Sequence, residues 1–288
     1  ELPNELYSFF NNKDTKCGKE KESGEKIAIP LTEGSDCMLR KGINHDIDSL
    51  VSCIRYICGK RENDVNEAFD YPLGNGNTPN QNFLNYISDT LKLETFILLN
   101  NGYFIRAYCT FKGLKPTKEE YKKYRGLFLK NSEYIKLFNL DHIKEYFESN
   151  TINEYEDIFS DINLINNSLT LEIIREIKLL SSYENYKEYL ISPIKKKEED
   201  FGHLLLLQKD LFVKNFIPLF FESKDTFHGI FHCPKYMNIN QIQKSVKPFV
   251  FIVNQNQYYE PIVNVKKIHG LKEQMFFDKL KIENIYLK

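Results

Sequence analysis

The chain has 288 residues, enough for one large domain or two modest ones and for a substantial buried core. Its 39 basic and 40 acidic residues leave a formal net charge of −1, and the absence of a basic stripe argues against nucleic-acid binding. No apolar run approaches the roughly 20 residues that a spanning helix needs, and no signal peptide opens the chain. We therefore expect a protein without a membrane span that is not secreted. Because it begins at Glu1 without an initiator Met, we also expect a piece of something longer.

The six cysteines show no dense, even spacing of the kind found in small secreted domains, so reduced thiols are predicted. They stand at Cys17, Cys37, Cys53, Cys58, Cys109 and Cys233. Neither these residues nor the histidines form a tight metal-binding motif, and no glycine-rich loop has the lysine that a phosphate cradle needs. The sequence therefore predicts neither a metal site nor a cofactor.

In the first part of the chain, apolar spacing predicts a short buried helix over Ser49–Gly59. Thr78 and Gln81 form a capping box that predicts a second helix reaching about Lys92. Two strand-like runs, Thr95–Leu99 and Tyr103–Tyr108, flank an Asn-Gly pair and predict a hairpin.

Further along, a capping box at Thr117 opens a stretch that is mainly helical until Pro193. The charged run around Lys196 is typical of a solvated loop. Strands are then predicted at Asn215–Phe221, Gly229–His232, Pro248–Val253 and Tyr259–Val265. The order favours an α+β fold with the sheet built from both ends of the chain. We expect one composite domain: residues 1–116 and 194–288 form its core, and residues 117–193 are a helical insertion.

The start of the helix at Ser49 is the position where chemistry is most plausible. In papain-like proteases a nucleophile occupies the N-terminus of a buried helix, and a histidine on a later strand is its base. Asp46, Leu50 and Ile54, with Tyr259 and Val263 on the late hairpin, make this layout resemble the OTU class of cysteine proteases, which remove ubiquitin. The resemblance implies an OTU-like, papain-related core.

At the two reacting positions the sequence departs from the OTU pattern, with Ser49 in place of cysteine and Tyr258 in place of histidine. A serine without a positioned base is a poor nucleophile, and tyrosine is a poor base at neutral pH. We therefore expect no catalysis at Asp46, Ser49 and Tyr258, and contact with a partner through Tyr258, Tyr259 and Glu260. Two simpler interpretations stay open: Ser49 as a helix N-cap, and the tyrosines as cross-strand packing.

A second resemblance covers roughly residues 39–265. It is carried, in order, by Leu39–Ile43 with Ser49–Ile54, Ser182–Leu190, His232–Pro234, and Lys247–Val253 leading to Tyr258–Ile262. These phrases resemble a conserved large protein of nucleocytoplasmic large DNA viruses, including giant viruses. The resemblance implies a scaffold or interaction module in the host cytoplasm or inside the virion. Its partners would be virion proteins or a ubiquitin-like protein, and self-assembly is open.

Two other functions remain as alternatives. The first is an active cysteine protease or deubiquitinase, with Cys37 or Cys53 as nucleophile and His228, His232 or His269 as base. The second is a virion factor associated with nucleic acid, which would need a coherent basic face.

Overall fold

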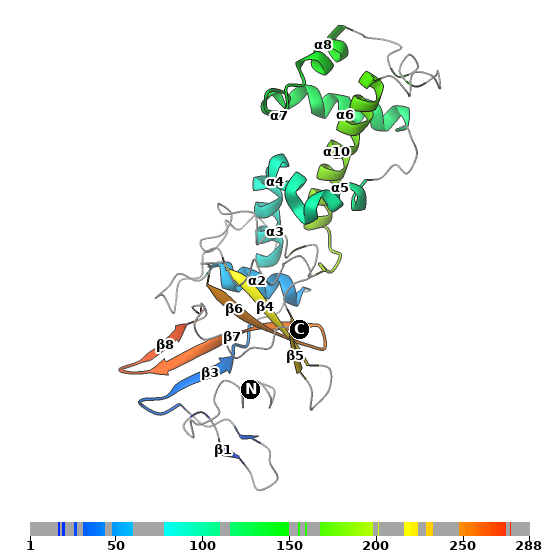
Figure 1. The fold of residues 1–288 in the computed structure, drawn as a ribbon. Coiled ribbons are helices and arrows are strands. Elements are labelled where there is room, and N and C mark those ends of the chain that lie inside the picture. Colours follow the sequence, from blue (N-terminus) through cyan, green and yellow to red (C-terminus); the bar gives the residue numbers. More distant parts are fainter. Residues whose placement is uncertain are drawn as a thin grey trace. The chain divides into compact units, whose positions relative to one another are not determined.

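A computed structural model describes the chain in sections and divides it into two compact units (Figure 1). The sheet unit comprises Glu1–Tyr86 with Pro193–Lys288, and the helical unit comprises Ile87–Ser192. The described residues are 17, 19–20, 26–27, 31–43, 48–59, 78–109, 116–149, 155, 159, 168–197, 201, 216–223, 229–232, 248–274 and 277. The fold is α+β, as predicted.

A mixed sheet forms the core of the sheet unit, with strand order β3-β7-β6-β4-β5 and with β8 also paired to β7. Among the described strands, β4 and β6 pair in parallel and the other pairs are antiparallel. Strand β3 comes from near the start of the chain and pairs with β7 from near its end, which confirms that both ends of the chain build the sheet. The strands are β3 (Asp36–Arg40), β4 (Ile217–Ser223), β5 (Gly229–His232), β6 (Phe249–Gln255), β7 (Tyr258–Lys267) and β8 (Leu271–Gln274); β1 (Lys19–Glu20) and β2 (Lys26–Ile27) pair separately.

Helix α2 (Ser49–Gly59) packs on β7 through an apolar stripe that includes Leu50, Ile54 and Ile57, all buried. Its bounds match the predicted helix, because the i, i+4, i+7 spacing leaves one face to be covered by the sheet. Helix α3 (Pro79–Thr90) begins at the predicted cap, where Thr78 Oγ1 accepts the Gln81 N–H at 3.3 Å. Both helices are therefore confirmed.

The helical unit is organised around the long helix α10 (Ser168–Ile191), which contacts α4, α5 and α6. At its centre the Tyr186 ring lies 5.1 Å from Phe104 and 5.5 Å from Phe96, measured between ring centroids. The other helices are α4 (Leu93–Leu98), the 3-10 turn η1 (Leu99–Gly102), α5 (Tyr103–Ala107), α6 (Lys118–Lys130), α7 (Ser132–Leu137) and α8 (Asp141–Ser149). The predicted helical stretch and its end before Pro193 are confirmed.

The predicted hairpin at Asn100–Gly102 is wrong, because this segment is helical. Leu93, Phe96 and Leu99 are buried at a spacing of three, which is a helical period that the Asn-Gly signal obscured. Gly102 adopts φ +79°, where a side chain would be strained. It is the last residue of η1 and the N-cap of α5. Since these helices pack with α10, the helical unit starts at Ile87 rather than at residue 117.

The prediction of reduced thiols is wrong for one pair, because Cys17 and Cys37 form a disulfide with an S–S distance of 2.03 Å. Their sequence separation is 20, so no short sequence motif predicts that these two cysteines pair. In the described part of the chain, no helix has the length and apolar character needed to cross a membrane.

Candidate functional site

The N-terminus of α2 is held by Asp48, which is the true N-cap of this helix. Asp48 Oδ1 accepts the backbone N–H groups of Leu50 at 3.1 Å and Val51 at 3.2 Å, while Oδ2 accepts that of Lys196 at 2.6 Å. A carboxylate at this position satisfies free N–H groups and interacts favourably with the helix dipole. The interpretation of Ser49 as the N-cap is therefore wrong.

Ser49 instead joins α2 to the β6–β7 hairpin. Its hydroxyl donates to the Gln257 carbonyl at 2.9 Å and accepts the Tyr259 N–H at 3.4 Å. The side chain is only 4% exposed. The two segments singled out by the sequence, the start of α2 and the start of β7, thus lie in direct contact.

A tight turn presents Tyr258 beside Ser49. Asn256 and Gln257 adopt φ values of 52° and 66°, which suit a two-residue hairpin turn, and Asn254 Oδ1 accepts the Gln257 N–H at 3.1 Å. Tyr258 is 57% exposed, whereas the Tyr259 ring packs edge-on against Phe220 with centroids 6.0 Å apart. Of the three predicted contact residues, Tyr258 has the most exposed aromatic surface.

Glu260 is not an exposed contact residue. It is buried, and its carboxylate pairs with the Nε group of Arg40 on β3. A second Arg40 nitrogen donates to Gln255 Oε1 at 2.7 Å. Burial lowers the pKa of Arg40. The ion pair joins β3 to β7, which are neighbours in the sheet.

Two residues that bond to Asp48 were not anticipated as part of this site. They are Asn80 and Lys196. Asn80 Nδ2 donates to Ser52 Oγ at 2.7 Å and to the Asp48 carbonyl at 3.3 Å, and its Oδ1 accepts Arg55 Nε at 2.9 Å. No local pattern marks Asn80, because its partners lie on α2 and at the N-cap of that helix, distant in sequence.

Lys196 corrects the prediction of a solvated loop. Its neighbours Lys195 and Lys197 are exposed, but Lys196 is buried. Burial lowers the pKa of its ammonium group, while the charge of Asp48 acts in the opposite direction. Lys196 Nζ donates to the Ile194 carbonyl at 2.6 Å.

This arrangement does not support nucleophilic catalysis by Ser49. A serine nucleophile needs a base that can take its proton. Within the described residues, the partners of the Ser49 hydroxyl are a backbone carbonyl and a backbone N–H, and neither can act as that base.

The reserve cysteines are placed unfavourably for catalysis. Cys37 lies on β3 and is consumed by the disulfide, so it offers no free thiol. Cys53 lies inside α2, is completely buried, and burial raises the pKa of its thiol well above the ordinary value. A reactive cysteine needs the opposite setting, partly exposed and with a lowered pKa.

Among the predicted bases, His269 is the one whose side chain the structure describes, and it pairs with Glu33 rather than with a cysteine. His269 is exposed in the turn after β7, with Nδ1 4.0 Å from Glu33 Oε1. His232 lies at the end of β5, opposite Phe220, and only its backbone is described. Asp46 and His228 lie outside the described residues. The described residues contain no group of three or more His, Cys, Asp or Glu that could hold a metal ion.

Comparison with known proteins places the chain in no family. No family model matches it, and no solved structure matches it. A curated protein, the methionine–tRNA ligase of Buchnera aphidicola subsp. Schizaphis graminum (strain Sg), is 25% identical over 156 residues. That match covers 52% of this chain and 26% of the ligase, so the chain spans about a quarter of that protein's length.

Proposed function

We propose that this chain is a catalytically inactive protein-binding module of a large DNA virus, associated with the virion and built on an OTU-like core. The observation that carries the proposal is the environment of Ser49. The residue stands at the nucleophile position of the OTU pattern and at the start of a buried helix. Its hydroxyl, however, is hydrogen-bonded to backbone groups of the hairpin.

The contact between α2 and the hairpin supports the OTU-like part of the proposal. That pattern requires the start of the helix and the start of a late strand to meet, and here Ser49 Oγ accepts the N–H of Tyr259, the second residue of β7. The proposal of a viral origin rests on the short sequence segments between about residues 39 and 265 that resemble the viral protein in the same order.

Tyr258 supports the binding role. It follows the turn, is 57% exposed, and directly precedes Tyr259, whose N–H bonds to Ser49. Tyrosine combines a large apolar ring with a polar tip and is enriched at protein interfaces. An exposed tyrosine in place of the base, beside a serine in place of the nucleophile, fits a surface that is used for binding.

The first experiment incubates the full chain with ubiquitin that carries a C-terminal electrophile, followed by mass mapping. We expect no labelled cysteine, while an active deubiquitinase in parallel is labelled. Labelling of Cys53 or another cysteine that disappears on its replacement by alanine contradicts the proposal and makes the protein an enzyme.

The second experiment titrates the full chain into isotope-labelled ubiquitin and follows amide shifts. We expect saturable shifts that weaken at least tenfold in Tyr258→Ala, as for a central aromatic contact. Tyr103→Ala is the matched control, because Tyr103 has nearly the same exposure (58%) but lies on α5. Unchanged binding by Tyr258→Ala, or no shifts with the wild type, excludes a ubiquitin-binding surface at this turn.

A further inference from the structure

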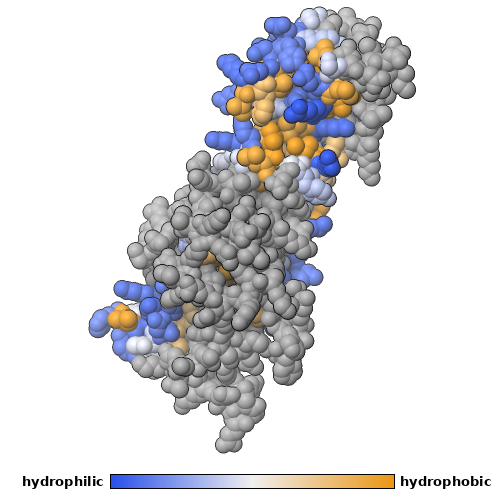
Figure 2. Space-filling model, viewed as in Figure 1, coloured by the Kyte–Doolittle hydropathy of each residue, from blue (hydrophilic) through white to orange (hydrophobic). Residues whose placement is uncertain are grey.

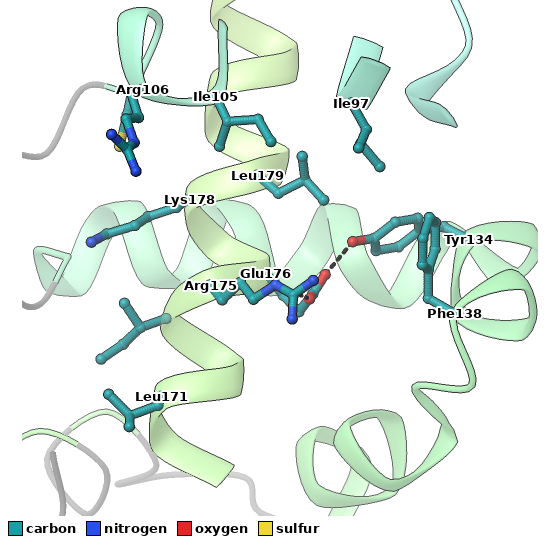
Figure 3. Close-up of a pocket in the computed structure, with 12 residues that line it drawn as sticks. Ile97, Ile105, Arg106, Tyr134, Phe138, Leu171, Arg175, Glu176, Lys178 and Leu179 are labelled. Atoms are coloured by element: carbon teal, nitrogen blue, oxygen red, sulfur yellow. Dashed lines mark hydrogen bonds and ion pairs between the residues drawn. The ribbon is translucent and has the colours of Figure 1, made fainter. Parts of the chain in front are cut away.

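The helical unit contains a pocket of about 570 Å³ that is separate from the Ser49 site (Figure 3). One wall is a stripe of α10 in which Leu171, Ile174 and Lys178 recur at helical spacing. Ile97 from α4, Ile105 from α5 and Phe138 after α7 line the rest of the pocket (Figure 3). The volume is in the range of pockets that bind ligands or anchoring side chains.

The pocket has an apolar lining that continues onto the surface. Leu171 is 50% exposed and Phe138 is also exposed, although both are large apolar side chains. Figure 2 shows apolar side chains gathered among hydrophilic ones on the surface of the helical unit. Exposed apolar surface with a polar rim is typical of an interaction site.

The charges around the pocket are predominantly positive. Arg106, Arg175 and Lys178 are the basic residues that line it, and Glu176 is the acidic one. Glu176 is buried, accepts a hydrogen bond from the Tyr134 hydroxyl, and lies 4.0 Å from Arg175 Nε. Its carboxylate is thus engaged within the wall, and the exposed part of the rim is cationic.

The pocket's length along α10 indicates the shape of its occupant. From Leu171 to Leu179 the lining covers two turns, which is about 12 Å at 1.5 Å per residue. Two turns of a partner helix would present apolar anchors at i, i+3 or i+4 and i+7 over the same length. Acidic residues beside those anchors would meet the cationic rim.

We propose that this pocket binds an amphipathic helix of a partner protein, with apolar anchors flanked by Asp or Glu. Leu171 and Phe138 contact the anchors, and Arg106 and Lys178 contact the flanking carboxylates. The site is independent of the surface at Tyr258, so either proposal can fail without the other.

The test uses the full chain and a fluorescein-labelled helical peptide of 14 residues, with leucines at i, i+4, i+7 and i+11 and glutamates on their flanks. Binding is measured by fluorescence anisotropy, with isoleucine methyl shifts to locate it. We expect saturable binding that weakens as salt is raised, and methyl shifts at Ile97, Ile105 and Ile174. A peptide with lysines in place of the glutamates should bind more weakly.

Two variants and two matched controls test the contacts. Leu171→Glu should raise the dissociation constant at least about tenfold by placing a charge among the anchors. Arg106→Glu should raise it about threefold, as for a rim charge. Leu271→Glu, from a leucine of similar exposure (54%) on β8, and Lys122→Glu, on the exposed side of α6, should leave it unchanged.

Three results overturn the proposal. The first is equal binding of the acidic and basic peptides, or methyl shifts outside the pocket. The second is no peptide binding while decanoate shifts the pocket methyls, which would mean a small amphiphile. The third is self-association of the chain that Leu171→Glu abolishes, which would mean that a second copy occupies the pocket.

Discussion

At the scale of single residues, the Ser49 hydroxyl joins two segments that lie 208 residues apart in the sequence. Because Asp48 caps the helix, replacing Ser49 removes only the bridge to the hairpin. We expect Ser49→Ala to destabilise the sheet unit by about 1–2 kcal/mol, since the Gln257 carbonyl and the Tyr259 N–H lose a partner.

Hydrogen exchange of α2 and β7 peptides measures this effect. Ser149→Ala is the control, because that serine is exposed and its hydroxyl donates to the Tyr146 carbonyl of its own helix at 3.1 Å. Equal protection of α2 and β7 in Ser49→Ala and in wild type would show that the bridge contributes nothing.

Glu176 makes a second prediction at this scale. Burial raises the pKa of its carboxyl, although the hydrogen bond from Tyr134 and the charge of Arg175 oppose this shift. A group whose pKa is raised on folding contributes stability below its ordinary pKa, and this contribution is lost as the pH rises through the folded value. We therefore expect Glu176→Gln to be at least as stable as wild type at pH 7 and to lack this loss above about pH 4.5.

Glu176→Ala is the contrasting variant. It leaves the buried Tyr134 hydroxyl without its acceptor and should cost about 1–3 kcal/mol. Urea denaturation of both variants between pH 4 and pH 8 separates the two effects. A Gln variant that is less stable than wild type at pH 7 would mean that the charged carboxylate stabilises the helical unit.

The three free cysteines among the described residues differ in their expected reactivity. Burial raises the pKa of the Cys53 and Cys58 thiols, whereas Cys109 is partly exposed. We expect maleimide at pH 7 to label Cys109 in the native protein and to spare the other two. Mass mapping before and after unfolding in urea makes the comparison, and rapid native labelling of Cys53 would refute its burial.

At the scale of elements, the two capping motifs of the sequence are realised differently. At α6, Thr117 accepts the Glu120 N–H and the Glu120 side chain accepts the Thr117 N–H, so both bonds of the box are made. At α3, Thr78 Oγ1 accepts the Gln81 N–H, and the Gln81 side-chain amide donates to Asn85 Oδ1 at 3.0 Å.

Thr117→Ala should therefore cost about 1 kcal/mol in the first turn of α6. Thr117→Ser keeps the hydroxyl and should cost less. Hydrogen exchange of α6 peptides measures the difference, and equal protection in both variants would show that the hydroxyl does not hold this helix end.

At the scale of the whole molecule, the Cys17–Cys37 disulfide belongs to the sheet unit alone. Closing a loop of about 20 residues is worth about 3 kcal/mol in the chain-entropy description. We expect reduction to lower the protection of β3 and β7 while α10 is unaffected. Hydrogen exchange with and without a phosphine reductant tests this, and an equal loss of protection in α10 would mean that the two units unfold together.

The same bond bears on the environment of the protein. Disulfides persist mainly in oxidising surroundings. The host cytoplasm keeps thiols reduced, so we expect Cys17 and Cys37 to be free thiols there and to be paired only in assembled particles that have left the cell. Thiol trapping of freshly lysed particles would show whether Cys17 and Cys37 are paired.

Local pattern by itself determined the elements whose signals act over a few residues. The stripe of α2, the caps at Thr78 and Thr117 and the late strands were all predictable, because side-chain period and end chemistry decide them locally. The Asn-Gly signal failed because the buried face of α4 against α10 outweighed the local turn preference.

Only the tertiary structure decided what the candidate site contains. Asp48 rather than Ser49 caps α2, Glu260 is buried in an ion pair, and Lys196 is buried within a charged run. Each depends on a partner distant in sequence, as with Asp48 and the Lys196 N–H, 148 residues away. The disulfide and the pocket along α10 have the same origin, since folding alone brings their residues together. Period and propensity describe neighbours in sequence, whereas hydrogen bonds and burial at a site are set by neighbours in space.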